Sequence, residues 1–337
     1  MRRERFRAWP TLVAWLCVAA ASPASAEPVV VKLATLVPDG SSWHQILKET
    51  AEKWRVSSGG AVTLRIFAGG VSGDDPDIVR KMRAGTLGAG LLTAIGVAEI
   101  DRSVYALGVP MVFSSYDEAY WVLEKMRSRL EASIEARGFV VLNWVDGGFV
   151  YFFSQKPVAT PDDLRKAKLF CVEGDPDVAD LWKSGGFEPV LLPTTGIAAA
   201  LQSGELTALG VPTYVAVVSQ YFLSARNMTD LPWQLLLGAT VVRKDAWEKI
   251  PVELRPALLD AMRQAGQRLR DDVRQSAGRD VEAMKKRGLH VVAIDGQTRA
   301  LWLKTAEGLY PKIRGRVVPA DAFDEALRWR DESRKRK

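Results

Sequence analysis

Apolar residues follow two alternating patterns along most of the chain. Short runs rich in β-branched residues, which are typical of buried strands, lie at residues 29–37, 61–68, 87–95, 168–172, 205–211 and 289–294. Between them apolar residues recur every three to four positions, which predicts helices at residues 42–57, from Asp75, from Ser115 to Glu135, from Thr160 and at 194–204. This alternation predicts an α/β fold with a largely parallel sheet.

Two further segments are long enough to connect domains. Residues 139–154 hold two apolar runs separated by Asp146, Gly147 and Gly148. Such turn residues are typical of a hairpin, and the alternative is one long bent strand that carries the chain from one domain to the other. Residues 247–287 show a nearly continuous helical pattern, which Pro251 and Pro256 interrupt near its start.

The N-terminus has the pattern of a cleavable secretion signal. Four arginines within the first seven residues precede an apolar stretch at residues 11–21, and the small residues Ala24 and Ala26 follow. The apolar stretch is too short to span a bilayer. We therefore expect cleavage after residue 26, a mature protein that starts at Glu27, and a periplasmic location.

The mature chain would hold together without an internal disulfide, because Cys171 is its only cysteine. Its length suggests two domains. The net charge of +6 comes from the two ends, since residues 27–327 hold 36 cations and 37 anions. Without a basic face, nucleic-acid binding is not expected. We interpret residues 328–337 as a solvated basic tail.

The residues suggest no catalytic, metal or cofactor site. His44 and His290 are far apart, and Cys171 has no evident basic partner. The glycine-rich stretch at residues 69–75 lacks the Lys-Ser/Thr of a phosphate-binding loop, and the glycines of residues 85–90 have the wrong spacing for a dinucleotide fold. An exported two-domain α/β chain without reactive groups is more often a binding protein than an enzyme, with its ligand in the cleft between the domains.

Several segments together resemble the solute-binding subunit of tripartite ATP-independent periplasmic (TRAP) transporters. They are KLATLVPDGSSW, RIFAGGVSGDDPDIVRKMRAGTLG, LGVPMVFSSYDEAYWVL, KPVATPDDLRKAKL, GFEPVLLPTTGIAAALQSGELTALGVP and KKRGLHVV. The resemblance extends from about Val30 to Ile294 in the family's order. It implies a two-lobed periplasmic-binding-protein-like fold, whose lobes are joined by hinge strands and a long helix and close around a small ligand that a membrane permease receives.

The resemblance also implies boundaries for the lobes. The first lobe would comprise residues 27–150 with about 237–280, and the second residues 151–236 with about 281–327. The segment after Gly296 departs from the family pattern. We expect it to form either an extra helix packed on one lobe or part of a dimer contact. We expect a monomer or a homodimer.

The departures from the family pattern cluster at positions where the family contacts its ligand. The family's arginine that holds a ligand carboxylate corresponds to Phe170, and a second ligand-facing arginine of some relatives corresponds to Val150. Gly196 stands where the family has a glutamate at a helix start. In residues 207–212 only the proline of the family's polar Asp-Gly-Gln-Glu-Asn-Pro run remains.

The loss of these polar groups predicts a hydrophobic or amphiphilic ligand. A carboxylate that enters a closed cleft loses several kcal/mol of hydration and needs a charged partner to recover it, which neither Phe170 nor Val150 supplies. An apolar ligand gains about 25 cal/mol per Å² of buried apolar surface. We predict ligand contacts for Phe170, Val150, Tyr214, Pro212, Val211, Glu173, Trp43 and Thr93.

Alternatives remain for several of these residues. Phe170 would equally pack inward between sheet and helix, and Trp43 fits a core position. Arg80 or Arg83 would replace the lost arginine if either reached the cleft. Glu173 and Asp175 would bind a ligand amine or remain solvated. Asp75 is explained by helix N-capping.

Two other functions remain open at this point. One is a binding protein for an ordinary organic acid, held by polar groups not identified in the sequence. The other is a periplasmic sensor or lipid-shuttling component that works without a permease. An enzyme is the least expected class.

Overall fold

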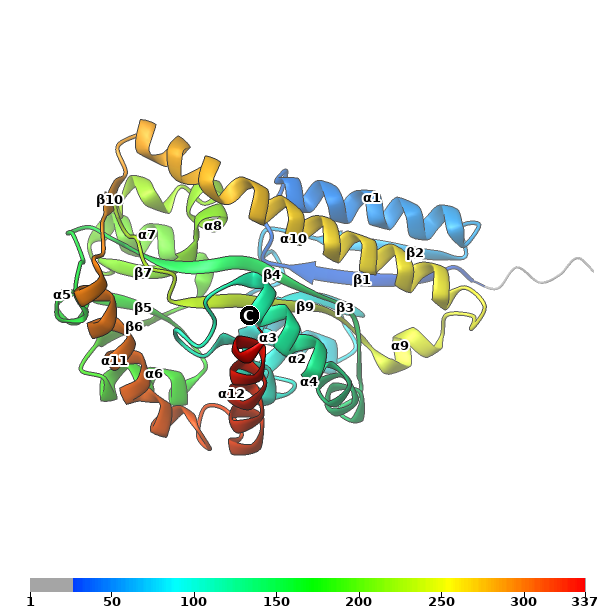
Figure 1. Ribbon diagram of the computed structural model, residues 1–337. Coiled ribbons are helices and arrows are strands. Elements are labelled where there is room, and N and C mark those ends of the chain that lie inside the picture. The colour runs from blue at the N-terminus through cyan, green and yellow to red at the C-terminus, as the bar shows by residue number, and fades with distance from the viewer. Residues whose placement is uncertain (1–26, 337) are drawn as a thin grey trace, which may run out of the picture.

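The computed structural model describes residues 27–336, so the predicted signal peptide of residues 1–26 and the last residue lie outside the described part. One sheet runs through the molecule in the strand order β2-β1-β3-β9-β4-β7-β5-β6 (Figure 1). Its strands are β1 (Val29–Thr35), β2 (Val62–Phe67), β3 (Ala89–Thr93), β4 (Phe139–Ser154), β5 (Lys168–Val172), β6 (Glu188–Leu192), β7 (Ala208–Pro212) and β9 (Gln234–Arg243). The short strands β8 (Asn227–Thr229) and β10 (His290–Val292) pair beside this path.

The sheet divides the chain into two lobes. The first lobe contains the parallel strands β1, β2 and β3 with the helices α1 (Ser42–Ser57), α2 (Asp75–Arg83), α3 (Ala94–Ala98), η1 (Arg102–Gly108) and α4 (Tyr116–Ala136). The second contains the parallel strands β5, β6 and β7 with α5 (Pro161–Arg165), α6 (Pro176–Ser184), η2 (Thr194–Gly196), α7 (Ile197–Ser203) and α8 (Thr213–Val218). The antiparallel strands β4 and β9 connect the lobes. This is the two-lobed α/β fold that the sequence predicts.

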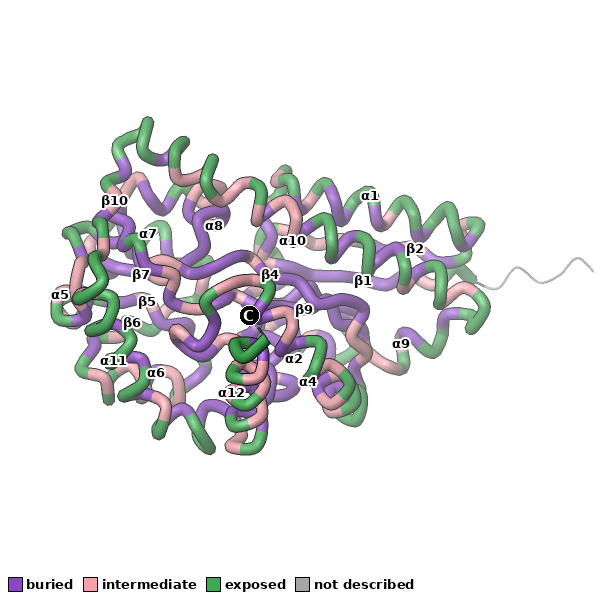
Figure 2. The backbone as a smooth tube through the Cα atoms, in the orientation of Figure 1, coloured by how far each residue is buried: buried purple, intermediate pink, exposed green. Residues whose placement is uncertain are grey.

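Apolar periodicity explains the local structure, as α1 illustrates. Ser41 caps this helix by accepting a hydrogen bond from the backbone N–H of His44 at 3.2 Å. The side chains of Leu47 and Trp54 face the sheet, where they pack against a cluster that includes Leu33. Figure 2 shows the same pattern throughout, with buried residues along the sheet and exposed residues on the outer turns of the helices.

Residues 139–154 form one strand, so the hairpin interpretation of this segment is wrong. Strand β4 pairs with β9 along most of its length and then with β7 of the second lobe. Its register against β9 shifts between Asp146 and Phe149, which accommodates the Gly147-Gly148 pair as an irregularity within the strand. The alternative of a bent strand between the domains is correct.

The long connecting helix begins later than its sequence pattern predicts. Helix α9 (Lys244–Glu248) ends before Pro251, and α10 (Arg255–Lys286) begins after it. Pro256 lies in the first turn of α10, where its missing N–H donor is not needed, so it opens the helix instead of interrupting it. Helix α10 then passes along α1, β4 and α8 and so contacts both lobes.

The C-terminal segment packs on both lobes, and the predicted solvated tail is part of a packed helix. Helix α11 (Gly296–Ile313) contacts α5 and α6, and α12 (Ala320–Lys335) contacts α4 and η1. Arg334 donates to the buried carboxylate of Glu118 at 2.5 Å, and Trp329 packs edge-on against Trp121. The charge pattern of residues 328–337 predicted a solvated tail because it does not show that α12 has an apolar side, which includes Phe323. Every helix within residues 27–336 is too short or too polar to cross a bilayer.

Candidate ligand-binding cleft

A cavity of about 420 Å³ lies between the lobes, at the ends of several strands. We call it the main cavity. From the first lobe it is lined by the ends of β1 and β3 and by Trp43 of α1; from the second lobe by the end of β7 and by Tyr214 of α8. Val145 and Val150 of β4 line it as well. Its volume falls within the range of roughly 300–1,000 Å³ that is usual for small-molecule sites.

The lining of the main cavity is mostly apolar. Among the described residues that line it, none is lysine, arginine, histidine or glutamate, and Asp75 is its only carboxylate. Four of them carry aromatic rings, namely Trp43, Phe170, Tyr214 and Tyr221. A ligand in this cavity would therefore meet no positive side chain.

Most residues that the sequence predicted for the ligand site line this one cavity. They are Phe170, Val150, Tyr214, Pro212, Val211, Trp43 and Thr93. Glu173 does not, and its predicted place in the cleft needs correction. Strand β5 ends at Val172 and the backbone turns at Gly174, where φ is +106°, so the Glu173 side chain is exposed.

Phe170 occupies both positions considered for it, because it packs in the core and also lines the cavity. Its side chain is half-buried and packs against the core cluster that contains Leu209 and Phe222. It also lines the main cavity. One part of the ring therefore stabilises the second lobe while another part faces the space between the lobes.

The two lobes meet across the cavity through a pair of aromatic rings. Trp43 of the first lobe stacks on Tyr214 of the second, with ring centroids 5.7 Å apart and an interplanar angle of 26°. Trp43 is buried, yet no described residue accepts a hydrogen bond from its Nε1. A buried indole N–H normally has a partner, so this donor is an exception among the described residues, although other atoms of the same ring line the main cavity.

Asp75 belongs to the cavity wall, whereas the sequence suggested a helix cap. The residue that caps α2 is Asp74, which also accepts a hydrogen bond at 2.6 Å from the backbone N–H of Thr194 in the second lobe. Asp75 is buried, and its Oδ2 accepts hydrogen bonds from the backbone N–H and the hydroxyl of Thr93, at 3.1 and 2.5 Å. Its Oδ1 has no partner among the described residues. Burial, assisted by the charge of Asp74, raises the pKa of Asp75 to about 7, although the hydrogen bonds from Thr93 oppose this shift.

The raised pKa of Asp75 predicts a pH-dependent stability. The folded protein holds this proton more tightly than the unfolded chain, whose carboxyl titrates near 3.8. The free energy of unfolding should therefore fall as the pH rises from about 4 to about 7, by roughly 4 kcal/mol from this group alone. We expect Asp75→Asn to remove this decline, as measured by urea unfolding at pH 5 and pH 8. Asp260→Asn, on the exposed side of α10, should retain it, and an unchanged decline in Asp75→Asn would refute the assignment.

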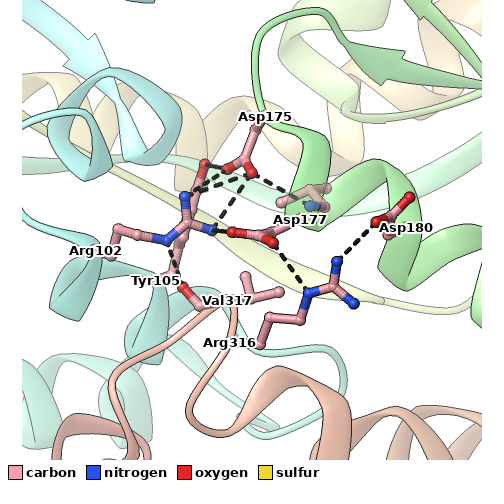
Figure 3. A network of polar contacts seen from close by, with 8 residues as sticks. Arg102, Tyr105, Asp175, Asp177, Asp180, Arg316 and Val317 are labelled. Atoms are coloured by element: carbon pink, nitrogen blue, oxygen red, sulfur yellow. Dashed lines mark hydrogen bonds and ion pairs between the residues drawn. The ribbon is translucent and has the colours of Figure 1, made fainter.

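A polar network joins the lobes on another side of the cleft (Figure 3). Arg102 of η1 pairs with Asp175 at 3.3 Å and with Asp177 at 3.6 Å, both at the start of α6. The hydroxyl of Tyr105 donates to Asp175 at 3.2 Å. Asp175 is buried within these contacts, so it is already paired and is not free to bind a ligand amine. The network stabilises an arrangement in which the two lobes touch.

Arg316 and Val317 attach the C-terminal segment to the same network. Arg316 pairs with Asp177 at 3.0 Å and with Asp180 at 2.7 Å, and Arg102 donates to the backbone carbonyl of Val317 at 3.0 Å. The chain between α11 and α12 is thereby held against both lobes.

Neither Arg80 nor Arg83 reaches the main cavity, so neither replaces the carboxylate-binding arginine of the family. Arg80 is exposed and pairs with Asp77 on its own helix. Arg83 donates to the backbone carbonyl of Glu99. Neither lines the cavity.

Comparison with known proteins identifies the family. The model of bacterial extracellular solute-binding protein, family 7, matches residues 33–315, which is most of the chain. The chain belongs to this family. Family 7 contains the solute-binding components of TRAP transporters, as the sequence resemblance implied, and these are binding proteins, not enzymes.

Curated relatives of the chain within family 7 share about a quarter of its residues. The C4-dicarboxylate-binding periplasmic protein DctP of Rhodobacter capsulatus is 24% identical over 313 residues, which cover 90% of this chain and 91% of that protein. The 2,3-diketo-L-gulonate-binding periplasmic protein YiaO of Escherichia coli is 24% identical over 277 residues, 78% of this chain and 84% of the relative.

Solved structures of TRAP periplasmic solute-binding proteins show the same fold. The Fusobacterium nucleatum protein with bound sn-glycerol-3-phosphate has a TM-score of 0.83 at 18% identity, and covers 91% of this chain and 98% of its own. The Haemophilus influenzae protein with bound L-gulonate has a TM-score of 0.82 at 18% identity, over 90% and 99% of the two chains.

Proposed function

We propose that this protein captures a hydrophobic or amphiphilic small molecule between its lobes and delivers it to a TRAP-type permease. The observation that carries the proposal is the lining of the main cavity, whose described residues include four aromatic rings and no lysine, arginine or histidine. Phe170 lies in this lining at the position where the family resemblance places the carboxylate-binding arginine.

The energetics of burial favour this ligand class. A carboxylate buried in the main cavity loses several kcal/mol of hydration. Hydrogen bonds from neutral donors would return about 1.5–3 kcal/mol each, and no described lining residue adds the opposite charge of a cation. Asp75 would repel such a ligand whenever it is ionised. Apolar surface instead gains about 25 cal/mol per Å² on burial, and the lining includes neutral polar side chains such as Gln234 and Ser219 for an uncharged polar group.

A second candidate ligand is an ordinary organic acid. It is favoured by the relatives, whose names or bound ligands include C4-dicarboxylate, L-gulonate and sn-glycerol-3-phosphate. An acid would have to be held by neutral donors alone, namely the hydroxyls and the Gln234 amide of the lining together with backbone N–H groups. The two candidates therefore predict different ligands, an uncharged amphiphile or a small carboxylate, and a binding experiment distinguishes them.

We also propose that the protein works in the periplasm after removal of residues 1–26. The relatives DctP and YiaO are both described as periplasmic, and the first 26 residues have the signal pattern. Uptake of the identified ligand by cells that carry the protein together with its permease would separate transport from a sensor or lipid-shuttling role.

The main test measures which ligand class raises the melting temperature of the mature protein. At 100 times its Kd a ligand adds about 2.7 kcal/mol to the free energy of unfolding, which corresponds to a rise of about 4 °C for a chain of this length. We expect this rise with 1-alkanols and none with succinate. Solvent extraction of the purified protein followed by mass spectrometry should release a bound lipid-like molecule. A rise with succinate and none with any 1-alkanol would overturn the proposal.

A further inference from the structure

A second, smaller cavity of about 180 Å³ adjoins the main one. We call it the small chamber. Five residues line both spaces, namely Ile95, Val150, Phe170, Gly210 and Gln234. The two cavities are therefore neighbours that share a wall, in which Phe170 is the largest side chain.

The small chamber is lined mostly by apolar side chains. Its walls include Phe152, Trp182 and Trp233, whose rings contact one another with centroids 5.4 to 6.4 Å apart. None of its described lining residues carries a charge. Burial raises the pKa of the Cys171 thiol to about 12, which keeps it neutral. The hydroxyl of Tyr105 is already used by Asp175.

The shared wall is thin at Gly210. A Cβ atom at this position would lie 3.1 Å from Val150 Cγ1 and 3.5 Å from Phe152 Cε1. A side chain there would therefore press on residues that line the small chamber. Because Gly210 has no side chain, it leaves space beside Val150 and Phe152 where the two cavities adjoin.

The small chamber is lined by parts of the chain from both lobes and from the C-terminal segment. Val109 comes from the first lobe, Val178 from the second, and Ile313, Val317 and Val318 from the C-terminal segment. The Arg102 network holds these three parts together. The match to the family model ends at residue 315, so Val317 and Val318 lie just after the matched residues.

We propose that the small chamber is a subsite for the hydrocarbon end of the ligand, about six carbon atoms long. This inference rests on the proposed function, because it assumes that the main cavity takes the rest of an amphiphile. The chamber is close in volume to the apolar cavity of about 150 Å³ that takes up one benzene molecule. The ligand then extends past Phe170, with its uncharged polar part in the main cavity and its hydrocarbon end among Phe152, Trp182 and Trp233.

Filling the small chamber tests the subsite. Gly108 lines it, and a Cβ atom there would meet only the carbonyl oxygen of Leu235, at 3.6 Å, so Gly108→Leu should fold and occupy the space. The matched control is Gly308→Leu, an exposed position on α11 where a Cβ has no neighbour within 4 Å. Val178→Phe on α6 is a second filling variant, should Gly108→Leu fail to fold.

The measurement is the Kd of straight-chain 1-alkanols from butanol to dodecanol. For the native protein we expect affinity to rise about fourfold per methylene while the chain lengthens from its polar end in the main cavity past Phe170 into the small chamber. In Gly108→Leu this rise should stop three to four carbons earlier, so dodecanol binds on the order of 100-fold more weakly while butanol is unaffected.

The outcomes separate this inference from the proposed function. If native protein and Gly108→Leu show the same dependence on chain length, and so does Val178→Phe, the chamber is not a subsite, although the main cavity still binds amphiphiles. If the native protein binds no 1-alkanol but binds succinate, both the subsite and the proposed function are wrong.

Discussion

Phe170→Arg should weaken the binding of uncharged amphiphiles by about 100-fold. The substitution removes a ring that lines both cavities, and burial of one large apolar side chain is worth roughly 1.5–3 kcal/mol. It also places a guanidinium among apolar walls, where ligand binding would strip its water. The Kd of 1-decanol, measured by calorimetry for native and variant protein, checks this.

The same substitution should create affinity for small acids. A guanidinium at position 170 would restore the charged partner that the resemblance assigns to the family, and charged hydrogen bonds contribute about 1.5–3 kcal/mol each. We expect succinate to bind Phe170→Arg at least tenfold more tightly than it binds native protein.

Leu191→Arg is the matched control for this experiment. Leu191 lies on β6, the strand next to β5, and its side chain is 46% exposed. It carries the same new charge without touching either cavity. If Phe170→Arg binds decanol as tightly as native protein does, Phe170 is only a core residue and the ligand does not touch it.

Gly238→Ala should destabilise the protein by about 3 kcal/mol or more. Gly238 lies on β9 between Thr93 of β3 and Val145 of β4, where the sheet passes from one lobe to the other. A Cβ atom there would lie 2.4 Å from the carbonyl oxygen of Leu92. This oxygen belongs to a central strand that is bonded on both sides, so it cannot move away without breaking the ladder. Urea unfolding should show a lower midpoint.

Gly278→Ala is the opposite case on the same chain. Position 278 lies within α10, and a Cβ there has no neighbour within 4 Å. Because alanine is the better helix former, this variant should gain about 0.5–1 kcal/mol. An unfolding midpoint for Gly238→Ala equal to that of native protein would show that β3 and β9 are not held as closely as described.

Much of the site was accessible to sequence reasoning because it lies at strand ends. Thr93 ends β3, and Val211 and Pro212 end β7. In parallel sheets the carboxyl ends of strands face the ligand crevice, so aligning the chain with the family pattern located them. Glu173 follows the end of β5 as well, but it begins a Glu-Gly-Asp-Pro turn, and its side chain is exposed, which was the alternative considered for it.

Asp75 and the small chamber could not be predicted in the same way. Asp74 and Asp75 are adjacent carboxylates with the same local propensity to cap a helix, and only the position of Thr93, 18 residues later, distinguishes them. The small chamber needs η1, α6 and the segment after α11 in one place. No sequence pattern within any one of these segments indicates that the three lie together in the fold.

The sequence by itself determined the alternation of strands and helices and the two-lobed α/β class, and it places the apolar residues Phe170 and Val150 where the family resemblance predicts arginines. Each of these follows from local periodicity or from residue type at an aligned position. Only the tertiary structure decided that β4 is one strand, that α12 packs on α4, and that Asp75 faces Thr93 in a cavity wall. Those outcomes depend on which segments, far apart in the sequence, bury apolar surface against one another. Such burial is a property of the packed chain, not of any one segment.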